Sequence, residues 1–137
     1  MELKTTTFGI IIGTRNIFNA KLAQEARKSV LEKMKKWGYD VVILPTDETP
    51  TGAIETYQDA KKCAALFAAN RDKIDGVIVV LPNFGDELGI VNTLNLAKLD
   101  VPVLVQACDD DNDKVDVKSR RDAFCGKLSV CNNLYQY

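Results

Sequence analysis

The sequence predicts an α/β protein in which one parallel sheet lies between layers of helices. Four short apolar segments alternate with longer stretches of helical periodicity, and three of those segments are apolar at consecutive positions. Strands covered by helices on both faces read as continuous apolar runs, whereas a strand with one wet face alternates. Right-handed crossovers between such units produce a doubly wound, flavodoxin-like sheet, a three-layer sandwich with the expected order 2-1-3-4.

The expected strands are the apolar segments 8–12, 41–44, 76–81 and 102–106. The runs without alternation are Ile10-Ile11-Ile12, Val77-Ile78-Val79-Val80 and Val103-Leu104-Val105. Between and after these strands, apolar residues recur at steps of three and four, which is the spacing of one helix face.

Four helices are expected from this spacing. The first ends at Trp37, because Gly38 follows as a stop signal. The second runs from Thr51 to about residue 70, the third from about 86 to 98, and the last from Asp122 onward. The apolar residues that show this spacing are Leu22, Ala26, Val30, Met34 and Trp37; Ile54, Tyr57, Ala64 and Phe67; Leu88, Val91 and Leu94; and Phe124, Leu128, Cys131 and Leu134.

The composition is that of an ordinary globular domain. The chain has 137 residues and a net charge of -1, so its charge indicates neither a nucleic acid nor an anionic membrane as partner. No apolar run approaches the roughly 20 residues that span a bilayer, and residues 1–5 do not resemble a signal peptide, so we expect a cytoplasmic protein. The four cysteines show neither a C-x-x-C pair nor zinc spacing, and free thiols are expected.

Two regions near the end of the chain allow further expectations. The polar run 109–114 is predicted to be an exposed loop rather than a calcium loop, since neither a closing Glu nor a Gly for the turn is present. The chain ends on Tyr135-Gln136-Tyr137, which is unusually aromatic for a natural domain end. We therefore expect residues 1–137 to form a single domain that is a fragment of a longer, multi-domain protein.

The sequence contains no histidine, the commonest general base and transition-metal ligand. Neither G-x-G-x-x-G nor a P-loop occurs, and the acidic residues of a phosphorylated receiver domain are missing after the first and third strands. We therefore predict no catalytic residue and no metal ligand in this chain, which would hold part of a binding site.

In an open α/β sheet, ligands bind beyond the carboxyl ends of the strands, where the strand order reverses. In a 2-1-3-4 order this crevice lies between the loops 13–19 and 82–89. An arginine fork, amides, a carboxylate and an aromatic ring suit a small polyhydroxylated or anionic ligand. The predicted substrate-binding residues are Arg15, Asn16, Asn19, Asn83, Phe84 and Asp86.

Some of these residues have structural alternatives. Arg15 could equally pair with a neighbouring carboxylate, and Asn83 after a proline is more often a turn residue. Phe84 could belong to the core, although its position between two turn-forming pairs favours exposure. Gly13 is expected to allow the tight turn from strand to helix.

Three motifs resemble the L-fucose isomerase/L-arabinose isomerase superfamily, in its fucose-isomerase-like branch, and specifically its N-terminal domain. The motifs are Ile11-Ile12-Gly13-Thr14-Arg15 with Phe18-Asn19, then Val80-Leu81-Pro82-Asn83-Phe84-Gly85-Asp86-Glu87, and finally Arg120-Arg121-Asp122-Ala123-Phe124-Cys125-Gly126-Lys127 leading into Ser129-Val130-Cys131-Asn132-Asn133.

The resemblance implies a parent enzyme that interconverts aldoses and ketoses with a divalent cation, usually Mn²⁺. The metal ligands of such enzymes are a Glu, an Asp and a His in later domains, so this chain alone would be inactive. The family's hexamers close each substrate pocket with a neighbouring subunit's N-terminal domain. The arginine after the first strand and the aromatic after the third would be Arg15 and Phe84, although relatives can carry Trp at the latter.

Two other hypotheses from different classes remain open. One is a stand-alone flavodoxin-like module that binds or senses a small ligand. The other is a flavin-binding electron carrier, for which only Thr14 offers a hydroxyl to a phosphate after the first strand. If the chain is a fragment, apolar patches that its parent buries would face water, and self-association is predicted.

Overall fold

The computed structural model describes residues 4–137. In chain order the elements are β1 (Thr7–Ile12), α1 (Ala20–Trp37), β2 (Asp40–Ile43), the 3-10 helix η1 (Pro50–Gly52), α2 (Tyr57–Ala69), β3 (Gly76–Leu81), α3 (Glu87–Ala97), β4 (Val103–Ala107) and α4 (Ala123–Gln136). The strands are all parallel and lie in the order β2-β1-β3-β4. The predicted doubly wound α/β sheet and its order are confirmed.

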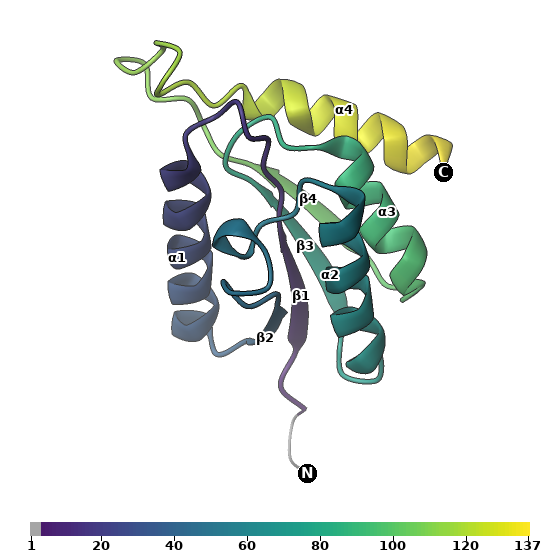
Figure 1. Ribbon diagram of the computed structural model, residues 1–137. Helices are drawn as coiled ribbons and strands as arrows, with labels where there is room; N and C mark the ends of the chain where they lie inside the picture. Colours follow the sequence, from purple (N-terminus) through teal and green to yellow (C-terminus); the bar gives the residue numbers. More distant parts are fainter. Residues whose placement is uncertain (1–3) are drawn as a thin grey trace.

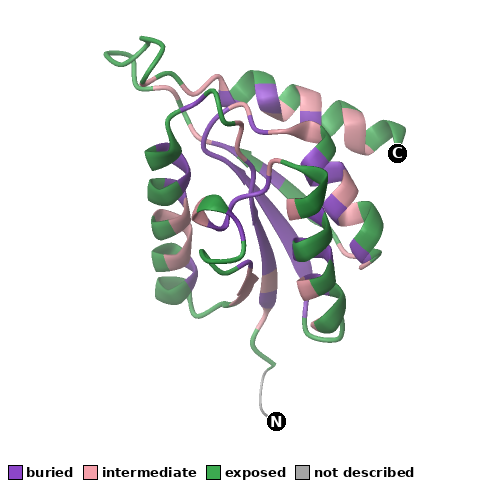
Figure 2. Ribbon diagram, viewed as in Figure 1, coloured by how far each residue is buried: buried purple, intermediate pink, exposed green. Residues whose placement is uncertain are grey.

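The sheet is covered on both faces, by different numbers of helices. α1 lies on one face, and α2 and α3 lie on the other, with α4 beside α3 (Figure 1). The central strands carry the most apolar runs because they need cover on both sides: every residue of β3 is buried, whereas the edge strand β4 is partly exposed (Figure 2).

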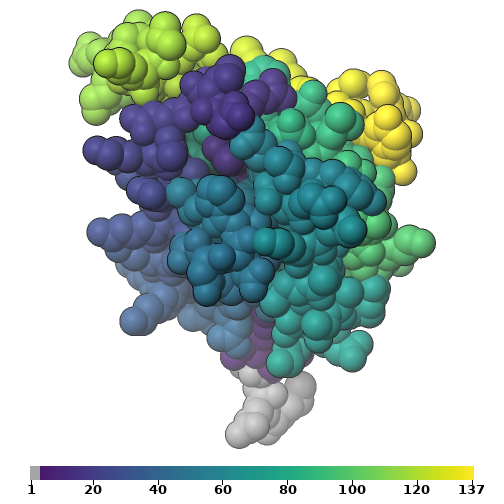
Figure 3. All heavy atoms as spheres, viewed as in Figure 1, coloured from purple at the N-terminus to yellow at the C-terminus, as the bar shows by residue number. Residues whose placement is uncertain are grey.

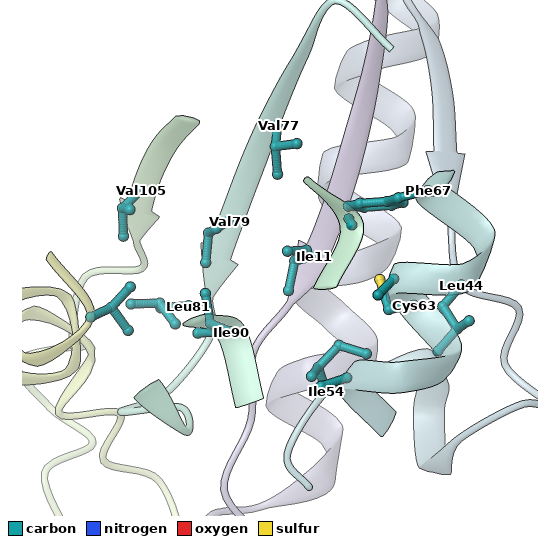
Figure 4. Close-up of a cluster of buried hydrophobic side chains, with 14 of the residues drawn as sticks. Ile11, Leu44, Ile54, Cys63, Phe67, Val77, Val79, Leu81, Ile90 and Val105 are labelled. Atoms are coloured by element: carbon teal, nitrogen blue, oxygen red, sulfur yellow. The ribbon is translucent and has the colours of Figure 1, made fainter. Parts of the chain in front are cut away.

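Successive residues of β1 enter two separate cores. Ile11 packs with Phe67 and Leu81 in the core under α2, α3 and α4 (Figure 4). Its neighbours Ile10 and Ile12 face α1 in the second core. Each such side chain contributes about 1.5–3 kcal/mol when fully buried, so the consecutive isoleucines stabilise both layers together.

Helix caps determine where the helices begin and end. Asn19 accepts a hydrogen bond from the amide of Lys21 at the start of α1, and Gly38 ends that helix in the left-handed region at φ 75°. The predicted second helix is wrong at its start: it begins at Tyr57, where Thr56 and Asp59 form a capping box.

The residues before α2 form extended backbone instead of helix. Ile54 donates its amide to the carbonyl of Ile12 at 2.7 Å and accepts from the amide of Thr14 at 3.0 Å, which gives a parallel bridge between Gly13 and Ile54. A helix from Thr51 would lose these bonds. Tertiary pairing therefore overrides the apolar periodicity here.

The predicted last helix is present as α4, but most of the apolar residues that indicated it do not face inward. Phe124, Leu128 and Cys131 are exposed, whereas Leu134 packs against the core and Ala123, Gly126 and Val130 are buried. Trp37, Tyr57 and Leu88, which belong to the apolar spacing of the other helices, are likewise more than half exposed. All four cysteines are free thiols, as predicted, and 109–114 is a largely exposed loop. Across residues 4–137 no helix has the length and apolarity needed to cross a membrane.

Candidate functional site

The two loops predicted to form the site meet at the carboxyl ends of β1 and β3. These strands lead into helices on opposite faces of the sheet, so the loops diverge at this point (Figure 1). The amide of Gly13 donates to the carbonyl of Val80 at 3.0 Å and continues the pairing beyond β1. A Cβ at Gly13 would lie 2.9 Å from Cδ1 of Ile90, so close packing, rather than the predicted tight turn, explains this glycine.

Asn83 ties the two loops together. Its Oδ1 accepts from the amides of Arg15 at 3.2 Å and Gly85 at 2.9 Å, and its Nδ2 donates to Oγ1 of Thr14 at 2.9 Å. The side chain is completely buried. It therefore positions the residues around it, as the turn alternative predicted, and does not present a polar group to the surface.

Arg15 and Phe84 lie against one another across the crevice. The guanidinium carbon is 4.7 Å from the centre of the Phe84 ring, which is the geometry of a cation–π contact. Nη2 of Arg15 donates to Oε2 of Glu87 at 2.7 Å. About 31% of the arginine side chain is exposed, so the N–H groups that Glu87 does not use remain available to a ligand.

Two carboxylates lie beside the arginine, and one of them, Asp86, is a predicted site residue. Asp86 caps α3 by accepting from the amide of Gly89 at 2.8 Å, and its other oxygen is 3.9 Å from Nη2 of Arg15. Glu87, the closer partner, is not among the predicted site residues. Its position in the first turn of a helix, where a negative charge is favoured, is the sequence feature that could have identified it.

The two remaining candidates, Asn16 and Asn19, lie on the exposed side of the β1–α1 loop. The amide of Asn16 donates to Oε1 of Glu55 at 2.8 Å, which brings a further carboxylate to the loop. Asn19 uses its Oδ1 to cap α1. In the space-filling view the purple chain that follows β1 reaches the surface beside the light-green segment that precedes α4 (Figure 3).

The third motif supports the β3–α3 loop from behind. Nη1 of Arg121 donates to the carbonyl of Pro82 at 3.0 Å. Gly126 packs against the backbone of Phe84 so closely that a Cβ would lie 1.9 Å from its carbonyl oxygen. Arg121 and Gly126 therefore hold the loop that carries Phe84 and Asp86.

The side chains at the ends of β1 and β3 have a mixed chemical character. It offers a half-buried cation, an aromatic ring and carboxylates at its rim, which suit the hydroxyl groups and the apolar face of a polyol. Within residues 4–137, no three His, Cys, Asp or Glu side chains are grouped as a metal ion would require. The residues present do not fit the Mn²⁺ that the resemblance implies for the parent.

Comparison with known protein families gives one match. The model for the fucose/sulfoquinovose isomerase N-terminal domain matches residues 9–137, which include every predicted site residue. Comparison with curated proteins and with solved structures returned no match. Since the family model covers nearly the whole chain, the protein belongs to the fucose/sulfoquinovose isomerase N-terminal domain family.

Proposed function

We propose that this chain supplies part of the sugar pocket of a metal-dependent aldose–ketose isomerase and does not carry out the isomerisation alone. The observation that carries the proposal is the contact between Arg15 and Phe84. Strand order alone selected their two loops, and the family match covers both. The guanidinium beside the ring offers N–H donors next to an apolar surface, and both suit the hydroxyl groups and the C–H face of a sugar.

In this proposal each crevice residue has a distinct part. The free N–H groups of Arg15 donate to substrate hydroxyls, and Phe84 covers the C–H face of the sugar. Asp86 accepts and the exposed side-chain amide of Asn16 donates at the rim, while Asn83 and Asn19 shape the loops. Other domains or a neighbouring subunit complete the pocket and hold the Mn²⁺, and the parent is a homo-oligomer.

An amide-resolved NMR titration of this chain tests the crevice directly. L-Fucose, a linear polyol and a flavin nucleotide are added in turn. Shifts confined to residues 15–19 and 83–86 with either sugar are expected, and Arg15→Ala removes them. Lys21→Ala is the matched control, because it deletes an exposed cation nearby on α1. Unchanged amide shifts with both L-fucose and the polyol would refute a preformed half-site.

A kinetic test uses the full-length isomerase. Losing a charged hydrogen bond to substrate costs about 1.5–3 kcal/mol, so Arg15→Ala lowers kcat/KM by about 10- to 150-fold. The subunit stays folded, since the lost contacts lie at the surface. Unchanged kinetics would remove Arg15 from the substrate pocket.

The same titration distinguishes the isomerase domain from the alternative function, a stand-alone flavodoxin-like module that binds a small ligand. A response to the flavin nucleotide alone would favour a flavin carrier over the isomerase domain. A flavin phosphate would need hydroxyl donors in the loop after β1. Thr14 has the one hydroxyl there, and its oxygen already accepts a hydrogen bond from Asn83, so the sugar is favoured over the flavin.

A further inference from the structure

The crevice between the β1–α1 and β3–α3 loops holds more carboxylates than cations. Its cation is Arg15, and the carboxylates that contact residues of these two loops are Asp86, Glu87 and Glu55. An arginine beside amides suits a neutral polyol and an anion alike, so the residue types at the strand ends leave the charge of the ligand open. The contacts of the arginine decide between these two kinds of ligand.

The positive charge of Arg15 is already matched by three neighbours. Its Nη2 donates to Oε2 of Glu87 at 2.7 Å, and Oδ2 of Asp86 lies 3.9 Å from the same nitrogen. The guanidinium carbon lies 4.7 Å from the centre of the Phe84 ring, and the face of an aromatic ring carries partial negative charge. An anion that approached Arg15 would meet two carboxylates, whereas a neutral hydroxyl group needs only one of the free N–H donors.

The amino terminus of α3 does not offer an anion site either. A helix start attracts anions through its free backbone amides and the positive end of the helix dipole. Here Oδ1 of Asp86 accepts from the amide of Gly89 at 2.8 Å, and Glu87 adds a second carboxylate in the first turn. Carboxylates of the protein therefore take the position in which a helix start would hold a phosphate, a sulfonate or a carboxylate of a ligand.

The charged side chains of the crevice are partly shielded from water. Those of Arg15, Asp86 and Glu87 are between 27% and 31% exposed. Water and salt screen charges at this depth less than they screen fully exposed ones. The two carboxylates therefore act on the charge of a ligand that lies against Arg15.

The cations next to the crevice do not reverse this balance. Lys21 follows the β1–α1 loop at an exposed position. Arg121 supports the β3–α3 loop by donating to a backbone carbonyl, and its own backbone amide donates to Oδ1 of Asp110 at 2.6 Å, which places a further carboxylate beside it. Across the part of the chain that the structure describes, Arg15 is the one cation that forms an ion pair with a carboxylate of the crevice.

We propose that Glu87 is a specificity-determining residue, which neutralises Arg15 and restricts the crevice to uncharged sugars and polyols. Sugars that place a phosphate, a sulfonate or a carboxylate against Arg15 are repelled. This inference rests on the proposed sugar pocket for the identity of its ligand. The effect of Glu87 on Arg15 does not depend on a sugar, because a simple anion can measure it.

An NMR titration at low ionic strength tests the proposal with three probes. L-Fucitol and L-fuconate differ only at one end, where the acid has a carboxylate in place of a hydroxymethyl group. Sulfate is a small anion that needs no sugar pocket, and chloride at the same ionic strength is its control. In the parent protein L-fucitol is expected to shift the amides of 15–19 and 83–86, L-fuconate to bind at least about 10-fold more weakly, and sulfate to leave the Arg15 Nε–H signal unchanged.

Glu87→Gln is the decisive variant, because glutamine keeps an acceptor for Arg15 and removes only the charge. It should strengthen the binding of L-fuconate by about 10-fold, leave that of L-fucitol within about 3-fold, and allow sulfate to shift the Arg15 Nε–H signal. If Glu87 only positioned Arg15, the selectivity between the two sugars would not change.

Asp86→Asn is a second variant, since asparagine can still cap α3. It should change the selectivity in the same direction and by less, because Asp86 lies farther from Nη2 of Arg15 than Glu87 does. Glu48→Gln is the matched control, because it removes an exposed carboxylate between β2 and η1, outside the crevice. The amide spectrum verifies that each variant is folded.

The outcomes separate this inference from the proposed function. If L-fucitol gives no shift while sulfate reaches Arg15 only in Glu87→Gln, the preformed sugar half-site is refuted and the exclusion of anions is supported. If L-fuconate binds the parent protein as tightly as L-fucitol, or if sulfate shifts Arg15 in the parent protein, the exclusion is overturned. It is equally overturned if Glu87→Gln gains no more affinity for either anion than Glu48→Gln does.

Discussion

At the scale of single residues, the crevice separates side chains that can meet a ligand from those that position them. Arg15 and Phe84 reach the surface, whereas Asn83 is buried and accepts from two backbone amides of two different loops. A buried backbone amide without a partner is costly, so these hydrogen bonds hold both loops in place. Asn83 therefore determines the shape of the crevice without contacting a ligand itself.

Replacing Asn83 by Ala is expected to destabilise the protein by about 2–4 kcal/mol. The change leaves the amides of Arg15 and Gly85 without their acceptor, and each unpaired buried group costs about 1–3 kcal/mol. Urea unfolding measures the free energy. Asn16→Ala, at an exposed position, is the control and should lie within about 0.5 kcal/mol of the parent. Equal effects of the two changes would contradict the role given to Asn83.

The cysteines differ in reactivity because burial differs. Burial raises the pKa of the Cys63 thiol to about 12, so it is almost entirely protonated at neutral pH. Cys125 and Cys131 are exposed. Iodoacetamide at mildly alkaline pH is expected to label these two rapidly and Cys63 only after unfolding, as peptide mass spectrometry can measure. Labelling of Cys63 at the same rate in the folded protein would show that the core opens.

At the scale of elements, α4 acts as a support for the β3–α3 loop. Its inward residues are small, and Gly126 allows the backbone of α4 to approach the carbonyl of Phe84. The glycine of the third sequence motif is therefore explained by this close approach. Apolar periodicity could not predict it, because that pattern is defined by the large apolar residues.

Gly126→Ala tests this support through the sign of its effect. In an exposed helix the change stabilises by up to about 1 kcal/mol. Here the new Cβ would lie 1.9 Å from the Phe84 oxygen, so α4 must move and the free energy of unfolding should fall. Ser129→Ala on the same helix is the control. A more stable Gly126→Ala protein would show that α4 does not press on the loop.

At the scale of the whole molecule, one ion pair joins the chain before β1 to the turn before β3. Asp75 accepts from Nζ of Lys4 at 2.7 Å and from the amide of Thr7 at 2.9 Å. These hydrogen bonds, that of Lys4 first, lower the pKa of Asp75. A lowered folded-state pKa adds stability that is present above the unfolded value of about 3.9 and is lost as pH falls through the folded value.

The protein should therefore lose stability on acidification below about pH 4, and Asp75→Asn should lose less over the same range. The midpoint of urea unfolding from about pH 5 to about pH 2 measures the difference. Asp47→Asn removes an exposed carboxylate that makes no hydrogen bond or ion pair within residues 4–137, and it serves as the control. Parallel pH profiles for the parent and Asp75→Asn would contradict the assignment.

The type of sheet, its strand order and the two loops where that order reverses could be predicted from the sequence. Consecutive isoleucines and valines require cover on both faces, and the order of the connections then decides where two loops diverge. These features can be predicted because they depend on the residue types within each segment and on the order of the segments along the chain. The missing histidine is equally a fact of the sequence.

The roles of the individual crevice residues depend on contacts between distant parts of the chain, which the sequence pattern does not contain. That Asn83 turns inward, that Glu87 pairs with Arg15 and that α4 presents its large apolar residues outward depend on partners 40 to 70 positions away in the chain. Periodicity records which face of a helix is apolar, whereas the inward face is chosen by how closely two backbones must approach. For α4 that distance is set by Gly126 and Phe84, and no local pattern contains it.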